Sequence, residues 1–333
     1  MTSNTKETVN QRLFGTAASP GILSDDGADH VVILMALYNG RADLDSQLES
    51  YRAQSHRNWS LIVSDDGSLD DGPDRIRDFA ARTDRDVTLL RGPGQGFARN
   101  FLELLSAAGP HVPFAALSDQ DDVWLPEKLG RALRHLANVP DGQPALYAGR
   151  TVICDQDLKP LRRSPEFALP PSFRNALVQS IGGGNTMVLN RAALDLAQET
   201  ARYAEGIVAH DWWLYQIVSG AGGRVIYDPE PLVLYRQHDR NLIGANDTMR
   251  ASLHRLAQVM RGRFRDWNTA NSTALDAAAH WLTPEARDTL ARFRDLRNHP
   301  VRRRLAALRD VGLYRQTARG NIALKLAALF NRI

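Results

Sequence analysis

Short apolar runs alternate with helix-like stretches along the first half of the chain, and this alternation constrains the fold more than any other feature. Four such runs end in polar or turn residues: VVILMALYNG (31–40), WSLIVSDDGS (59–68), VTLLR (87–91) and VPFAALSD (112–119). Continuous apolar runs of this length are typical of buried parallel strands. Strands alternating with helices predict right-handed crossover units, and therefore an α/β fold with a Rossmann-like, open, mostly parallel sheet flanked by helices.

The second half of the chain extends this pattern and then changes it. We expect a strand at 145–155, a glycine-rich start of another at 182–190 and a helix at 209–222. The stretch 223–238 predicts two short strands broken by its two prolines. Beyond residue 246 the pattern is wholly helical, with Gly312 and Gly320 as expected breaks.

We divide the chain into a loose leader (1–29), a catalytic domain (30–246) and a basic helical C-terminal region (247–333). The leader lacks the basic start and apolar run of a signal peptide. No window approaches the roughly 18 consecutive apolar residues that a spanning helix needs. The single cysteine, Cys154, excludes an internal disulfide and fits a reducing compartment. We therefore expect a cytoplasmic protein.

Positive charge is concentrated in the C-terminal region. Residues 250–333 hold 16 Arg and one Lys against six acidic residues, although the whole chain has a net charge of only +3. These arginines could form a solvated face over helices that pack on the catalytic domain. Arg302, Arg303 and Arg304 lie beside apolar stripes and could instead make a peripheral contact with the anionic inner face of the plasma membrane. No nucleic-acid partner is expected, because the sequence has no zinc finger, recognition-helix signature or aromatic platform.

Polar residues follow three of the predicted strands at their carboxyl ends. Tyr38 and Asn39 follow the first strand, Asp66 the second, and the turn 119–122 the fourth. In open α/β sheets the ligand crevice lies outside the carboxyl ends of the strands. We therefore expect these residues to converge in one cleft.

The turn SDQDDVW holds three carboxylates, Asp119, Asp121 and Asp122. Carboxylates this close repel one another, so they must face water, share a proton or hold a cation. An acidic run is often only a solvated loop, but this one is anchored by the preceding strand and by Trp124 and Pro126. Hard oxygen donors at such a turn suit Mg²⁺ or Mn²⁺. We interpret the turn as a metal site.

Four further motifs carry polar or glycine residues of interest, and three of them allow two interpretations. SDDGS (64–68) is either a turn with local backbone bonds or a carboxylate that accepts the ring N–H of a pyrimidine. GPGQG (92–96) does not match the dinucleotide fingerprint, so we interpret it as a turn. GGGN (182–185) is either a flexible turn or a place where the backbone approaches a ligand closely. HDWW (210–213) is either a core segment with a helix-terminal charge or a carboxylate partly desolvated by aromatic rings, as a general base would be.

Taken in order, ALYNG, SDDGS, FARN, SDQDDVW, GGGNTMV, AHDWW and YRQH resemble the motif series of family 2 inverting glycosyltransferases with the GT-A fold. HDWW and YRQHDRNLIGAN resemble the rhamnosyltransferase-like branch that builds bacterial surface polysaccharides. The resemblance covers about residues 30–246. Each motif is weak alone, but seven in the right order are specific.

The resemblance implies a role for each matching residue. Asp211 corresponds to the catalytic base, and Asp121 to the direct metal ligand. Asp119 corresponds to a ribose or metal contact, and His238 lies where a late residue reaches the metal or the diphosphate. The implied nucleotide contacts are Ala36, Tyr38, Asn39, Asp66 (for the uracil or thymine ring) and Arg99, together with the backbone of Gly183 and Gly184.

The implied reaction is transfer of one sugar, with L-rhamnose from dTDP-rhamnose as the first candidate and UDP-sugars or other dTDP-sugars as alternatives. The acceptor would be a glycan or a lipid-linked glycan. Two departures matter: His210 stands where the family has a second acidic residue beside the base, and the Q-x-x-R-W sequence of processive synthases is absent. A sugar nucleotidyltransferase is disfavoured, because ALYNGRADL lacks the expected Gly-rich, basic loop. A non-catalytic nucleotide-sugar-binding module is disfavoured by Asp121 and Asp211.

Overall fold

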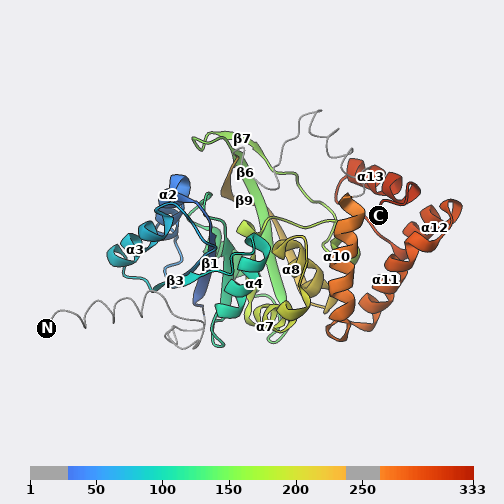
Figure 1. Ribbon diagram of the computed structural model, residues 1–333, viewed down its shortest axis with the longest axis horizontal. Helices are drawn as coiled ribbons and strands as arrows, with labels where there is room; N and C mark the ends of the chain where they lie inside the picture. The colour runs from blue at the N-terminus through green and yellow to red at the C-terminus, as the bar shows by residue number, and fades with distance from the viewer. Residues whose placement is uncertain (1–28, 238–262) are drawn as a thin grey trace.

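The computed structural model describes residues 29–237 and 263–333 (Figure 1). Within these ranges nine strands form one sheet in the order β3-β2-β1-β4-β8-β6-β9-β5, and β7 pairs with β6 beside this path. The strands are β1 (Val31–Leu37), β2 (Trp59–Asp65), β3 (Val87–Arg91), β4 (Phe114–Ser118), β5 (Val123–Trp124), β6 (Ala145–Cys154), β7 (Pro160–Arg163), β8 (Val188–Asn190) and β9 (Arg224–Arg236).

The strands β1 to β4, which come first in the sequence, pair in parallel. β1 pairs in parallel with both β2 and β4, and β2 pairs in parallel with β3. β8 is antiparallel to β4 and to β6, so the sheet becomes mixed beyond β4, although β6 and β9 are again parallel. The predicted α/β class, an open sheet flanked by helices, is therefore confirmed, while the sequence pattern does not predict the antiparallel pairs.

Helices cover both faces of the sheet (Figure 1). Their bounds are α2 (Arg41–Arg52), α3 (Gly72–Arg82), α4 (Phe97–Ala107), α5 (Lys128–Leu136), α6 (Phe173–Ala176), α7 (Arg191–Thr200), α8 (His210–Gly220), α10 (Arg263–Ala277), α11 (Pro284–Asp295), α12 (Val301–Val311) and α13 (Ala318–Leu329). Side chains of β1 alternate between two buried clusters: Ile33 and Met35 pack with α2, α3 and α5, whereas Val32 and Leu34 pack with α4, α7 and α8. This alternation is the period-two pattern of a strand buried on both faces.

The prediction of two short strands in the stretch 223–238 is wrong. The stretch 223–238 is not two short strands, because β9 is one strand of 13 residues. It pairs with β6 at 224–228 and again at 233–236, with a register shift between the two parts. Pro229 and Pro231 have no N–H to donate to a ladder and fall in this gap. The prolines therefore interrupt the pairing and not the strand.

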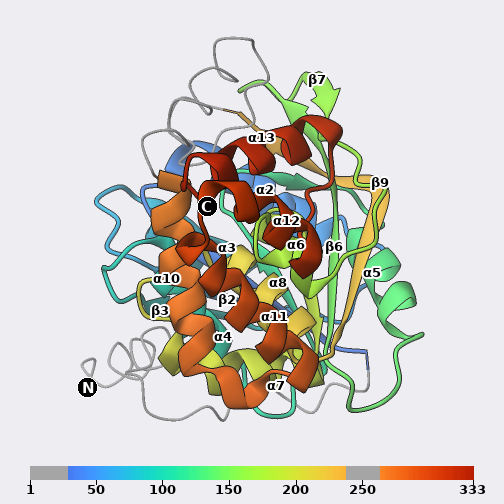
Figure 2. The ribbon, with the colours of Figure 1, turned by 90° about the vertical axis from the view of Figure 1, so that its right-hand side faces the viewer.

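The C-terminal helices α10 to α13 lie together at one end of the molecule, next to α8 (Figures 1 and 2). The Trp267 ring of α10 packs edge-on against Trp212 of α8, with centroids 6.4 Å apart, and the Asn271 Oδ1 accepts the Val208 N–H (3.2 Å). Leu275 and Leu290 belong to the same buried cluster as the side chains of α8. The C-terminal region thus shares its core with the sheet domain.

The described part of the C-terminal region is helical, as predicted. Gly312 ends α12 with a φ of 76°, which is the expected break. Gly320 lies inside α13 and is not a break, because Thr317 Oγ1 accepts the Gly320 N–H (3.0 Å) and begins the helix there. The predicted leader, apart from Asp29, and the predicted boundary at residues 246 and 247 lie outside the described residues.

No helix in the part of the chain that the structure describes has both the length and the apolar character needed to cross a membrane.

Candidate active site

One side chain, Gln120, joins the end of β1 to the acidic turn. The Gln120 Oε1 accepts the Tyr38 N–H (2.8 Å), and its Nε2 donates to the Tyr38 carbonyl (3.0 Å). The amide thus pairs with the backbone as a neighbouring strand would. A Cβ at position 40 would lie 2.4 Å from the Gln120 side chain, which explains the glycine there. The ALYNG and SDQDD motifs therefore form one structural unit.

The loop after β2 is tied to β1 through Asn39. The Asn39 N–H donates to Ser68 Oγ (2.9 Å), and the Asn39 Oδ1 accepts the Leu69 N–H (2.8 Å). Asn39 has a φ of 49°, a conformation that asparagine adopts more readily than most residues. Asp65 Oδ1 accepts the Ser68 N–H (3.0 Å), so SDDGS is a turn with local bonds. These bonds bring Tyr38 and Asn39 beside the end of β2.

Asp66 holds the glycine-rich loop that follows β3. Its Oδ1 accepts the Gly94 N–H (2.7 Å) and its Oδ2 accepts the Gly96 N–H (2.8 Å). The two glycines have φ values of 68° and 89°, so GPGQG is the predicted turn. Each carboxylate oxygen has a second lone pair, so this geometry leaves acceptor capacity for the ring N–H of a base. The assignment of Asp66 to the nucleotide base stays a prediction.

Carboxylates from distant parts of the chain influence one another at this end of the sheet. Burial, and then the negative charges of Asp121 and Asp211, raise the pKa of Asp119 to about 7. Two charges interact this way only when they are close together. The acidic turn and the start of α8 therefore lie close together, although the argument from strand ends did not include α8.

Asp211 lies in the first turn of α8 and accepts two backbone donors. The Trp212 N–H (2.6 Å) and the Gly184 N–H both donate to its carboxylate. Burial raises the pKa of Asp211 to about 6, and these N–H groups limit the rise because they stabilise the ionised form. Gly184 begins a short 3₁₀ turn, 184–186, so the GGGN motif positions Asp211. The nucleotide contact assigned to Gly183 and Gly184 stays a prediction.

His210 is a buried, neutral residue beneath that glycine turn. Its ring stacks on Phe101 with centroids 3.8 Å apart and meets Phe97 edge-on. Burial lowers the pKa of His210 to about 3, and neither ring nitrogen has a hydrogen-bond partner among the described residues. A Cβ at position 184 would lie 2.3 Å from His210 Nε2. The histidine beside Asp211 therefore packs against the glycine turn and requires glycine at position 184.

Asp122 has a different environment from the other two carboxylates of the turn. It is fully buried, its Oδ2 accepts from Asn185 Nδ2 (2.5 Å), and its Oδ1 accepts the Arg236 N–H (3.2 Å). Burial and the charges of Asp121 and Asp119 raise its pKa. The turn therefore has one interior carboxylate, while Asp119 and Asp121 are partly exposed.

The remaining predicted residues are placed as follows. Arg99 lies on α4 and forms an ion pair with Glu103 (2.6 Å). Ala36 lies near the end of β1, paired with Ser64 of β2. His238 lies outside the described residues. The sequence reasoning missed Gln120, Asn185 and Arg236; each lies within a recognised motif, but a polar side chain does not reveal its distant partner.

Asp119 and Asp121 fit a Mg²⁺ or Mn²⁺ ion. Both offer hard carboxylate oxygens, and the pKa of Asp119 is raised first by burial and then by the negative charges of Asp121 and Asp211. Among residues 29–237 and 263–333, no group of three or more His, Cys, Asp or Glu side chains is arranged to hold a metal. Mg²⁺ commonly takes one or two carboxylates and completes its shell with phosphate oxygens and water. The turn therefore suits an ion that is bound together with a diphosphate.

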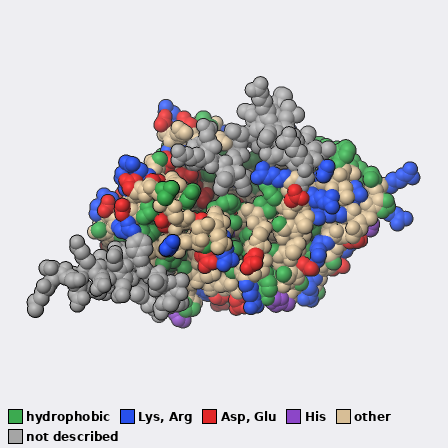
Figure 3. Space-filling view, viewed as in Figure 1, with side chains coloured by type: hydrophobic (Ala, Val, Ile, Leu, Met, Phe, Trp, Pro, Cys, Tyr) green, Lys and Arg blue, Asp and Glu red, His purple; other side chains and the backbone are tan. Residues whose placement is uncertain are grey.

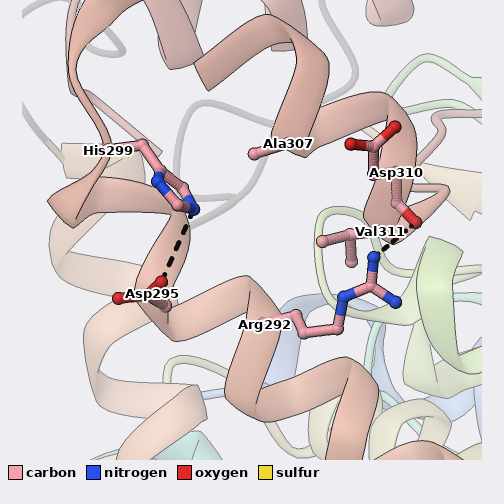
Figure 4. Close-up of a pocket in the computed structure, with 6 residues that line it drawn as sticks. All are labelled: Arg292, Asp295, His299, Ala307, Asp310 and Val311. Atoms are coloured by element: carbon pink, nitrogen blue, oxygen red, sulfur yellow. Dashed lines mark hydrogen bonds and ion pairs between the residues drawn. The ribbon is translucent and has the colours of Figure 1, made fainter. Parts of the chain in front are cut away.

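A small pocket of about 140 Å³ lies between α11 and α12, among the C-terminal helices (Figure 4). His299 and Asp295 form an ion pair there (3.5 Å), and Arg292 donates to the Asp310 carbonyl (3.0 Å). Because these polar groups pair with one another, the pocket adds nothing to the site at the strand ends.

The parallel strands β1, β2 and β4 end at the same edge of the sheet, and the carboxylates of the acidic turn and of α8 interact there, as expected for a GT-A glycosyltransferase. The sequence profile described as Glycosyl transferase family 2 matches residues 32–192. This match places the segment 32–192 in glycosyltransferase family 2, which is a family of enzymes. A sugar nucleotidyltransferase is thereby set aside.

Two related glycosyltransferases and one solved structure are similar to this chain. "dTDP-rhamnosyl transferase RfbG" of Shigella flexneri is 27% identical over 254 residues, which cover 72% of this chain and 84% of that protein. "UDP-Glc:alpha-D-GlcNAc-diphosphoundecaprenol beta-1,3-glucosyltransferase WfgD" of Escherichia coli is 32% identical over 167 residues, 50% of this chain and 62% of that protein. The crystal structure of S. aureus TarS 1-349 in complex with UDP-GlcNAc aligns with a TM-score of 0.51 at 13% identity, over 85% of this chain and 89% of that one. This last similarity shows the fold alone.

Proposed function

We propose that this enzyme transfers a sugar from a nucleotide-diphosphate donor, with dTDP-L-rhamnose as the first candidate, to a hydroxyl of a glycan or lipid-linked glycan during synthesis of a cell-surface polysaccharide. The observation that carries the proposal is the partly buried Asp211 carboxylate, which accepts the Trp212 N–H (2.6 Å) and lies near the acidic turn. The name of RfbG supports the rhamnose donor, and the name of WfgD supports a diphosphoundecaprenol-linked acceptor. UDP-sugars are the second candidate donors, because the WfgD name includes UDP-Glc.

In the proposed reaction the acceptor oxygen attacks the anomeric carbon from the side opposite the leaving group. Its proton passes to the Asp211 carboxylate, the glycosidic C–O bond forms, and the bond to the phosphate oxygen breaks with its electron pair leaving on the nucleoside diphosphate. The anomeric configuration inverts. Burial of Asp211 supports this role, because partial desolvation makes a carboxylate a stronger base.

The nucleotide would lie across the ends of β1 and β2. Tyr38, Asn39, Asp66 and Arg99 are the proposed contacts, and Asp119 and Asp121 would hold Mg²⁺ or Mn²⁺. When bound, the ion offsets negative charge on the diphosphate. The bonds of Gln120 and Asn39 support this arrangement, since they fix the strand ends relative to the acidic turn.

The rate of transfer is expected to fall as the pH falls through about 6. Asp211 must be ionised to accept the proton, and its raised pKa of about 6 means that it is protonated at a higher pH than an ordinary aspartate. The measurement is the pH dependence of kcat/KM between pH 4.5 and 8, with thermal unfolding followed over the same range. A rate that stays constant down to pH 5 in folded enzyme would contradict the role of Asp211.

We also propose that α12 and α13 place the enzyme on the anionic inner face of the plasma membrane, where a lipid-linked acceptor lies. Five large apolar side chains on or at the end of these helices are exposed: Val301, Leu305, Ile322, Leu326 and Phe330. Basic and hydrophobic side chains lie side by side over this end of the molecule (Figure 3). Apolar groups between basic ones are typical of surfaces that bind anionic bilayers.

The membrane proposal predicts binding to vesicles that contain about 30% phosphatidylglycerol. Replacing Ile322 and Phe330 by Ser should weaken binding by about tenfold, because less apolar surface enters the interface. The matched control replaces Leu69 and Leu161, which are 93% and 59% exposed elsewhere, by Ser. Cosedimentation at low and high salt measures the effect. Equal loss in both double variants, or no salt-sensitive binding by the wild type, would refute the proposal.

A further inference from the structure

Arg236, the last residue of β9, lies buried behind the acidic turn and is only 6% exposed. Its Nε donates to the Asp121 carbonyl (3.0 Å) and lies 3.1 Å from the Asp43 carboxylate of α2. One terminal nitrogen donates to Ser46 Oγ (3.0 Å), and the other to the Gln156 carbonyl. The guanidinium therefore connects α2, the acidic turn and the loop after β6 at a single point.

The backbone of the same residue reaches the interior carboxylate of the turn. The Arg236 N–H donates to Asp122 Oδ1 (3.2 Å), while Asn185 of the GGGN motif donates to Asp122 Oδ2 (2.5 Å). Asp122 is thus held from β9 on one side and from the glycine turn beside Asp211 on the other. Three motifs that are far apart in the sequence share one buried hydrogen-bond network.

A guanidinium is suited to this position. It stays ionised when buried, and its planar set of donors can bind carbonyl, hydroxyl and carboxylate oxygens at the same time. Lysine would offer the same charge from a single nitrogen and could not satisfy all four acceptors. The buried charge is compensated by Asp43, so the network does not leave an isolated charge in the interior.

We propose that Arg236 is a positioning residue that fixes the peptide of Asp121, so that the carboxylates of the turn are preorganised for a divalent cation and its diphosphate. Asp122 contributes to the same positioning, because it joins the acidic turn to Asn185, the last residue of the GGGN motif. The inference rests on the proposed function, since it assumes that Asp119 and Asp121 hold the ion. Groups that orient metal ligands commonly affect metal affinity without touching the metal.

The test compares Arg236→Lys with the same substitution in another arginine–aspartate pair, in which only the aspartate is buried. Arg131 forms two hydrogen bonds with the buried Asp228 carboxylate of β9 (2.5 and 2.9 Å), away from the acidic turn. Arg131→Lys therefore controls for the loss of a comparable interaction. Free Mn²⁺ is measured by electron paramagnetic resonance in the presence of dTDP or UDP, and thermal unfolding is recorded for each variant.

Arg236→Lys is expected to raise the apparent Kd for Mn²⁺ by about 10- to 100-fold, and Arg131→Lys to leave it unchanged. Asp122→Asn, which keeps the size of the side chain, should weaken Mn²⁺ binding in the same direction. If folded Arg236→Lys binds Mn²⁺ with wild-type affinity, the positioning role of Arg236 is overturned, but the proposed function is not. If the wild-type enzyme binds no Mn²⁺ with either nucleotide, the metal site of the proposed function fails as well.

Discussion

Asp211→Asn is expected to lower the rate of sugar transfer by about 10³-fold while the affinity for the nucleotide stays within about twofold of the wild type. The amide has nearly the same shape and its oxygen can still accept the Trp212 N–H, but it cannot take the acceptor proton. Initial rates and calorimetric titration with dTDP or UDP measure the two quantities separately.

The matched control for this substitution is Asp195→Asn on α7, where an exposed carboxylate pairs with Arg191 (2.6 Å). This variant should keep the wild-type rate. If Asp211→Asn retains more than about a tenth of the rate, Asp211 is not the general base, because removal of a general base typically costs 10²- to 10⁴-fold.

Gly184→Ala is expected to lower transfer by about 10²-fold and the free energy of unfolding by about 1–3 kcal/mol. Its Cβ would lie 2.3 Å from His210 Nε2, so the glycine turn must shift. That shift moves the N–H that donates to Asp211, and a small misplacement of a catalytic group has a large effect on rate. Rates and thermal unfolding are the measurements, with Gly109→Ala as control, because a Cβ at position 109 meets no atom within 4 Å.

A double-mutant cycle separates this clash from a general loss of packing. His210→Ser removes the ring that the new Cβ would meet, although it also leaves a cavity beside Phe101. The additional loss of stability caused by Gly184→Ala should therefore be smaller in the His210→Ser background. Additive losses in the cycle would show that His210 does not set the requirement for glycine.

Much of the fold could be predicted because the decisive signals are local. VTLLR coincides with β3, and the runs around β1, β2 and β4 are apolar on both faces, as parallel strands covered by helices must be. β9 could not be predicted correctly, because whether proline ends a strand or falls in a pairing gap depends on the register with β6. Gly320 was ambiguous for a similar reason, since the cap supplied by Thr317 outweighs the low helix propensity of glycine.

The part of the site that could be predicted consists of residues that directly follow the carboxyl ends of strands. Asp119 follows β4, whereas Asp211 lies in the first turn of α8, so the argument from strand ends did not predict that their charges interact. The network of Gln120, Asp122 and Arg236 could not be predicted, because its bonds join residues from 63 to 190 positions apart and depend on side-chain geometry. Those bonds are what hold the predicted residues in place.

The most direct test of the central claim is hydrolysis of nucleotide sugars by the full chain, with and without Mn²⁺ or Mg²⁺, over a panel of dTDP-, UDP- and GDP-sugars. Slow, metal-dependent release of nucleoside diphosphate from one donor, dTDP-rhamnose first, is expected, and Asp121→Ala should abolish it. Asp211→Asn should bind the same donor without turnover. Failure of the wild type to bind or hydrolyse any of these donors would contradict the proposed function.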